Sequence, residues 1–340
     1  MYVEENEQRQ QTIEYKKKRL MQLLYLNRIA FLKPIEKYII VKTYMDYRYP
    51  DVSDRFFHKV LKFSYTDWRQ FVGRNIREKS CEALRYEKIK EGVISDMRWL
   101  HSQHGGICTI DDESYPHLLR EIDDPPIVLY YIGDLSNISR PSVSIVGTRK
   151  PNQLGDKASF DMGKALCKKG INVVSGFALG IDIAAHKGLL SSYQNNVGHN
   201  GAANINTNIN TNINQCGNAV VVLGTHIDYI YPRRHLPFAQ KILNVGGVFL
   251  SELPLHMNMN KYSFISRNRI ISGLSMDTVV VQSPSKSGAL ATARFALEQG
   301  RELWVHSVGM HPDFQGSQKL VEEGAGVLNS ADDMELPIFE

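Results

Sequence analysis

The 340-residue sequence lacks several features that would place it in a common protein class. It has no run of about 18 apolar residues, so we expect no transmembrane helix. The charged N-terminus has no apolar segment, which argues against a secretory signal peptide. The four cysteines are scattered and none has Cys-x-x-Cys spacing, so we expect reduced thiols rather than disulfides or a metal site. These absences predict a cytoplasmic protein that does not contact a membrane.

The usual nucleotide-binding and hydrolytic motifs are also missing. No Gly-x-Gly-x-x-Gly follows a strand pattern, which argues against a dinucleotide dehydrogenase. The sequence contains neither a Gly-x-x-x-x-Gly-Lys-Ser/Thr phosphate loop nor a His-Glu-x-x-His motif. We therefore expect no cofactor and favour a binding protein over an enzyme.

Charge is unevenly distributed along the chain. Residues 1–100 contain 21 lysines and arginines against 14 aspartates and glutamates, whereas the remainder contains 19 against 22. A basic region beside a near-neutral one is compatible with a polyanionic partner. On the charge alone, an ordinary solvated surface is the favoured interpretation.

Two regions with different patterns follow one another. Residues 1–101 have helical periodicity, with a cap predicted at Ser53 or Asp54, another at Thr66 and a last helix ending at Gly92. Residues 102–340 contain strand and helix patterns that alternate from residue 143 onward. This alternation predicts an α/β fold with an extended Rossmann-like, doubly wound, mostly parallel sheet, preceded by a small all-helical domain.

One insertion interrupts the alternation. Residues 191–218 are rich in Asn and repeat the letters INTN. Such a composition buries little apolar area, so we expect a flexible surface loop, with a short hairpin arm as the alternative.

Three strand patterns lead into loops of small residues. The first, at 143–150, contains Gly147, Thr148 and Arg149 at the end of a strand. Ligands bind at the carboxyl edge of a parallel sheet, where a guanidinium is well placed for a phosphate. A surface salt bridge is the alternative for Arg149.

The second loop follows the strand pattern at 171–175. Ser175, Gly176 and Gly180 are predicted to present free backbone N–H groups to an anion. Asp182 either caps the following helix or orients the loop. For His186, a structural role is favoured over a catalytic one.

The third group precedes and follows a strand pattern at 278–282. Basic residues alternate with an aromatic ring in Lys261, Phe264, Arg267, Asn268 and Arg269, and a small-residue loop with Ser287 and Gly288 follows. Cations that track a backbone and a ring on which a base stacks are typical of single-stranded nucleic acid sites. Core packing is the alternative for Phe264.

These segments, together with "SYPHLLREIDDPPIVLYYIGDL", "VVVLGTHIDYIYP" and "GGVFLSELP", resemble the DNA-processing protein A (DprA, or Smf) family from about residue 106 to 335. The resemblance implies a homodimer that binds and protects incoming single-stranded DNA and helps to load the recombinase RecA in natural transformation. It implies DNA contacts for Arg149, Lys261 and Phe264, and a domain resembling a sterile alpha motif in the helical region. Leu179 stands where the family has arginine, which removes one cation. We expect no C-terminal winged helix, because the sequence stops at Glu340.

Two other hypotheses stay open on the sequence. An enzyme that hydrolyses the N-glycosidic bond of nucleoside monophosphates would need Glu252 or Asp182 as its acid. An interaction scaffold would keep its partner after loss of Arg149.

Overall fold

The computed structural model describes residues 2–336, with the exception of 47, 49, 79, 80, 82, 83, 85, 195–215 and 258. Most of the predicted insertion at 191–218 therefore lies outside the described residues. Contacts divide the chain into two compact units. The first comprises Met1–Tyr115, Asp123–Tyr130 and Glu252–Pro254, and the second comprises Pro116–Ile122, Tyr131–Ser251 and Leu255–Glu340. The predicted domain boundary at residue 101 stays a prediction.

The first unit is mainly helical. Its helices are α1 (Tyr2–Asn27), α2 (Pro34–Tyr44), α3 (Pro50–Val60), α4 (Tyr65–Val72) and α6 (Tyr86–Ser102), and strand β1 (Gly105–Thr109) follows. Aromatic rings form much of its core: Trp68 is 1% exposed, and the rings of Phe31 and Phe63 meet its indole edge-on. These rings stabilise the unit by burial and edge-to-face packing.

Three of the predicted helix ends in this unit are wrong. Ser53 lies within α3, where its buried hydroxyl donates to Gln22 instead of capping a helix. The cap of α4 is Ser64 rather than Thr66, because the Ser64 hydroxyl accepts from the Asp67 amide in a capping box. Gly92 does not end a helix but lies inside α6, where the side chain of Arg28 packs against it.

The second unit is built on a sheet. Its strands are β2 (Val128–Gly133, shared with the first unit), β3 (Ser142–Val146), β4 (Asn172–Ser175), β5 (Ala219–Val222), β6 (Val248–Ser251), β7 (Asp277–Val280), β8 (Glu302–His306) and β9 (Gly326–Leu328). The hydrogen-bonded order is β1-β2-β6-β5-β4-β3-β7-β8-β9. Every pairing from β6 to β9 is parallel, as predicted. Strands β3 to β7 are buried throughout, which is typical of a sheet covered on both faces.

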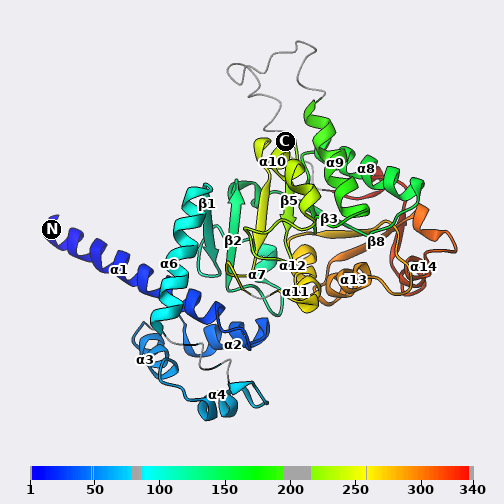
Figure 1. The fold of residues 1–340 in the computed structure, drawn as a ribbon. Coiled ribbons are helices and arrows are strands. Elements are labelled where there is room, and N and C mark those ends of the chain that lie inside the picture. The colour runs from blue at the N-terminus through cyan, green and yellow to red at the C-terminus, as the bar shows by residue number, and fades with distance from the viewer. Residues whose placement is uncertain are drawn as a thin grey trace. The chain divides into compact units, whose positions relative to one another are not determined.

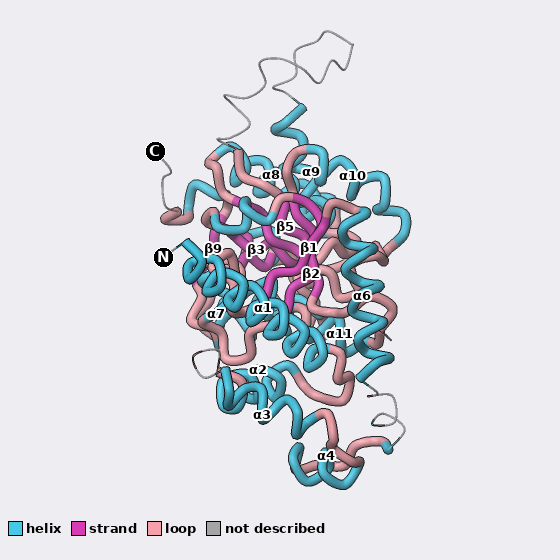
Figure 2. The backbone as a smooth tube through the Cα atoms, turned by 90° about the vertical axis from the view of Figure 1, so that its left-hand side faces the viewer, coloured by secondary structure: helices cyan, strands magenta, loops and turns pink. Residues whose placement is uncertain are grey.

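Helices cover the two faces of this sheet (Figure 1). They are α7 (His117–Arg120), α8 (Gln153–Lys168), α9 (Ile181–Gln194), α10 (Leu236–Asn244), α11 (Lys261–Ser266), α12 (Asn268–Gly273), α13 (Gly288–Glu298) and α14 (Gln315–Glu322). In the turned view, α8, α9 and α10 lie above the strands and α11 lies below them (Figure 2). The chain leaves β3 toward α8 on one face and β7 toward α13 on the other.

The neighbouring strands β3 and β7 therefore form a topological switch point, where open α/β sheets bind ligands. The predicted doubly wound fold is confirmed. Among the described helices, none combines the length and apolar character needed to cross a bilayer.

Candidate functional site

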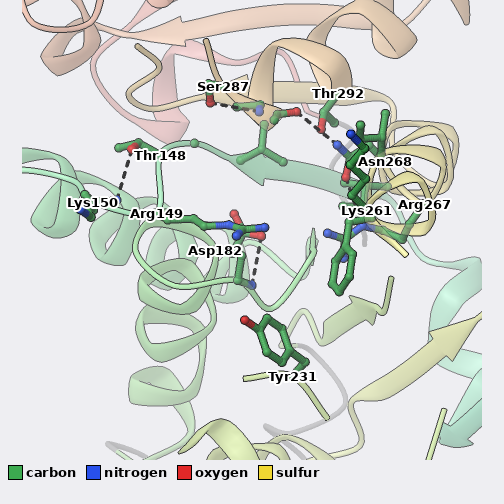
Figure 3. Close-up of a pocket in the computed structure, with 18 of the residues that line it drawn as sticks. Thr148, Arg149, Lys150, Asp182, Tyr231, Lys261, Arg267, Asn268, Ser287 and Thr292 are labelled. Atoms are coloured by element: carbon green, nitrogen blue, oxygen red, sulfur yellow. Dashed lines mark hydrogen bonds between the residues drawn. The ribbon is translucent and has the colours of Figure 1, made fainter. Parts of the chain in front are cut away.

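A cavity of about 830 Å³ opens at the carboxyl ends of β3 and β7, at the switch point of the sheet. Residues from the loops after β3, β4, β5 and β7, and from α11 and α12, line it. Figure 3 shows the labelled side chains, among them Arg149, Lys261 and Tyr231, converging on this space. The predicted residues that the cavity brings together are Gly147, Thr148, Arg149, Lys261, Phe264, Arg267, Asn268, Ser287 and Gly288.

The loop after β3 is held against the end of β7 by Gln282. The Thr148 amide donates to the Gln282 carbonyl (2.7 Å), and the Gln282 side-chain amide donates to Asn152 (2.7 Å). A Cβ on Gly147 would lie 2.5 Å from Ile181, so only glycine allows the loop to approach α9 this closely. These contacts fix the backbone and leave the Arg149 and Lys150 side chains exposed at the cavity.

The loop after β4 does not have the free N–H groups that the sequence predicted at its start. The Asp182 carboxylate accepts hydrogen bonds from the amides of Gly176 (3.1 Å) and Ala178 (3.3 Å). This internal carboxylate therefore occupies the donors that an external phosphate would need, and Asp182 orients the loop.

Ser175, Gly176, Gly180 and Arg269 do not line the cavity. The Ser175 hydroxyl is buried and donates to the Ile145 carbonyl (2.6 Å). Gly176 packs against the Arg267 guanidinium, and Gly180 takes a φ of +77° that favours glycine. Arg269 is 1% exposed and donates to the Ser266 carbonyl (3.0 Å). Their positions indicate structural roles.

Arg267 is buried in the floor of the cavity. Its guanidinium donates to the carbonyls of Gly176 (2.9 Å) and Val222, and to the Asn268 side chain (3.1 Å). Burial lowers the pKa of Arg267 to about 10, although the charge of Asp182 acts in the opposite direction. Burial likewise raises the pKa of Asp182 above its usual range, against the influence of Arg267 and the two amides. For both groups, desolvation outweighs the attraction between them.

Lys261 and Phe264 are presented by α11. Asn260 caps this helix, because its side-chain oxygen accepts from the amides of Tyr262 (2.8 Å) and Ser263 (3.3 Å). Lys261 is exposed, whereas Phe264 is half-buried between Gly224 and the Tyr231 ring, whose centroid lies 5.9 Å away. Phe264 thus has one supported face and belongs to the lining as well as to local packing.

Sequence reasoning missed part of the lining. Lys150 directly follows Arg149, and Lys286 directly precedes Ser287, so both were adjacent to predicted residues. Tyr229 and Tyr231 come from the loop after β5. That loop also begins at the carboxyl end of a strand, and this position could have marked both tyrosines as candidate site residues.

The described lining contains five cationic side chains (Arg149, Lys150, Lys261, Arg267 and Lys286) and one acidic side chain, Asp182. Asp182 is engaged by two loop amides, and Glu252 belongs to the first unit and is not in the lining. The exposed cations and three aromatic rings suit an anionic ligand with planar groups.

Comparison with known proteins identifies the family to which the chain belongs. Residues 106–336 match the family of DNA recombination-mediator protein A. The chain belongs to that family. Protein Smf of Borreliella burgdorferi is 30% identical over 92% of this chain and 87% of its own length. DNA processing protein DprA of Bacillus subtilis is 37% identical over 68% of this chain and 72% of its own length.

Solved structures of family members have the same fold. DprA of Streptococcus pneumoniae superposes with a TM-score of 0.65 at 25% identity, covering 91% of this chain and 99% of that one. DprA of Helicobacter pylori superposes with a TM-score of 0.54 at 27% identity, covering 67% of this chain and 93% of that one. The H. pylori structure is described as showing a single-stranded DNA binding mode. The resemblance predicted from the sequence motifs is confirmed.

Proposed function

We propose that this protein binds single-stranded DNA in the cavity at the β3–β7 switch point, as a recombination mediator without catalytic activity. The observation that carries the proposal is the convergence of four exposed cations with a half-buried ring of Phe264. Membership of the recombination-mediator family and the DNA-binding relative from H. pylori support it.

Each component of the cavity has a physical task in this proposal. Arg149, Lys150, Lys261 and Lys286 neutralise backbone phosphates, which releases counterions and makes binding salt-dependent. The ring of Phe264 offers a stacking surface worth about 1–3 kcal/mol per base, whatever the base. A duplex presents its bases stacked and paired, so it cannot use the ring in this way. The site therefore favours single strands without reading their sequence.

Fluorescence anisotropy with labelled single-stranded and double-stranded DNA over a salt series tests the proposal. We expect wild type to prefer the single strand, and Lys261→Ala to reduce the slope of log K against log salt by about 0.7. Phe264→Ala should weaken binding at least about fivefold without changing that slope. Lys168→Ala, at the far end of α8, is the matched control. Equal binding by all four proteins would refute the site.

We further propose that the protein protects incoming single strands, acts as a homodimer and transfers the strand to the recombinase RecA. Family membership motivates these steps. The expected results are a dimer mass in analytical ultracentrifugation and faster RecA filament formation on DNA coated with this protein. A monomer that does not accelerate filament formation would contradict them.

A further inference from the structure

We infer that a second DNA-contacting surface continues the cavity outward along the segment Tyr231, Arg233 and Arg234, which we term the exit track. This inference rests on the proposed function, because it concerns the same strand as it leaves the cavity. The segment starts at the end of the loop after β5 with Tyr231, and Arg233 and Arg234 open the short helix Arg233–His235. The ligand class is the sugar-phosphate backbone and bases of single-stranded DNA.

The exit track is physically continuous with the cavity. Tyr231 lines the cavity, is 49% exposed, and its ring meets that of Phe264 at 65°. Figure 3 shows Tyr231 at the border of the group of lining side chains. Arg233 places its guanidinium 5.4 Å from the ring centre of Tyr229, another lining residue. A strand stacked on Phe264 therefore meets Tyr231 next, and then a cation.

Within the described part of the chain, no acidic side chain neutralises the charge of the exit track. Arg233 and Arg234 are both exposed, and neither forms an ion pair with any residue that the structure describes. The charges of Arg234 and of the exposed Lys187 both act on the buried His235 and help to lower its pKa, after burial itself. These cations therefore extend the positive surface beyond the cavity. Adjacent exposed aromatic and arginine side chains are what a non-specific single-strand site combines.

Strand length separates the exit track from the cavity. We propose measuring the anisotropy of labelled oligothymidylates of about 4 and about 16 nucleotides, lengths that span the range of single-strand site sizes. The short strand fills the cavity alone, whereas the long strand also reaches the exit track. The variant is the double substitution Arg233→Ala and Arg234→Ala, and the control is Lys168→Ala with Lys241→Ala, which removes the same charge from the ends of α8 and α10.

The expected result is a loss confined to the long strand. Removing two phosphate contacts lowers the slope of log K against log salt for the long strand by about 1.4. If the variant and wild type bind equally at 1 M salt, this difference makes the variant about 25-fold weaker at 0.1 M salt. Affinity for the short strand and the affinity of the control should match wild type. Arg233→Lys with Arg234→Lys should restore the slope, because lysine also neutralises phosphate. Thermal unfolding of each variant checks that the fold is unchanged.

The outcomes also separate this inference from the proposed function. Wild-type-like binding of the long strand by the double alanine variant overturns the exit track and leaves the cavity as the site. An equal loss for short and long strands overturns it too, because the arginines would then act on the cavity itself. If wild type binds neither strand at low salt, the proposed function and the inference fail together.

Discussion

Replacing Arg267 with methionine should destabilise the fold rather than remove a DNA contact. Arg267 lies in a motif whose cations suggested phosphate binding, yet its guanidinium is buried and donates to two backbone carbonyls and an amide oxygen. Methionine has a similar length and fills similar space but supplies no donor. The carbonyls of Gly176 and Val222 would then be buried without these hydrogen bonds.

The expected cost follows from those contacts. A buried acceptor that loses its donor costs about 1–3 kcal/mol, so two carbonyls predict about 2–6 kcal/mol. The substitution also removes the nearby cation that opposes the burial-raised pKa of Asp182, which adds to the loss. Because these effects overlap, we expect a loss of about 3–5 kcal/mol in the free energy of unfolding.

Urea unfolding at pH 7 measures this loss, with Lys261→Met as the exposed control. Combining Arg267→Met with Asp182→Asn gives a double-mutant cycle, since asparagine can still accept from the amides of Gly176 and Ala178. The second change should recover part of the loss. The reasoning is refuted if Arg267→Met unfolds at the wild-type urea concentration while its DNA affinity falls, because Arg267 would then be a DNA ligand.

Three further outcomes are expected. Burial lowers the pKa of His186 to about 3, so only the unfolded state binds a proton at this histidine as the pH falls below about 6.5. The free energy of unfolding should therefore fall by about 2 kcal/mol between pH 6.5 and 5. Urea titrations of His186→Leu should lack this pH-dependent loss. A Cβ on Gly188 would lie 1.8 Å from the Phe160 carbonyl, so Gly188→Ala should push α9 from α8. The free energy of unfolding should fall by about 1–3 kcal/mol, and the melting temperature should fall with it. Gly288→Ala, at a glycine with open space around it, should change neither. Leu179→Arg should steepen the salt slope of DNA binding by about 0.7 at unchanged stability; an unchanged slope would show that this loop lies off the DNA path.

The sheet was largely predictable from the sequence because most of its strands are short, mainly apolar runs that loops of small residues follow. The strand pattern at 302–306 coincides with β8, and the strand pattern at 219–223 is one residue longer than β5. The short edge strand β9, at 326–328, was not predicted, because a glycine and an exposed Val327 leave little apolar pattern. In the helical unit, Ser53 was mistaken for a cap, since its burial against Gln22 depends on α1 and α3 packing together.

The sequence predicted those site residues that directly follow the carboxyl end of a strand. Arg149 and the loop at 287–288 were predicted in this way, because the carboxyl ends of parallel strands lie at one edge of the sheet. The order of cations along 261–269 could not reveal which of them would be buried. Fewer than two helical turns separate the exposed Lys261 from the buried Arg267, and only tertiary packing decides that difference.

The exposed and the buried cations of the cavity differ in how far they are hydrated in the free protein. A cation that must bind and release a phosphate has to remain hydrated in the free protein, since a buried cation has already exchanged its water for protein acceptors. Arg149, Lys150, Lys261 and Lys286 meet that condition, and Arg267 does not. Arg267 instead joins the ends of β4 and β5 through the carbonyls of Gly176 and Val222. In the proposed function, the buried arginine sets the shape of the floor and the exposed cations hold the strand, so stability and affinity should respond to different substitutions within one motif.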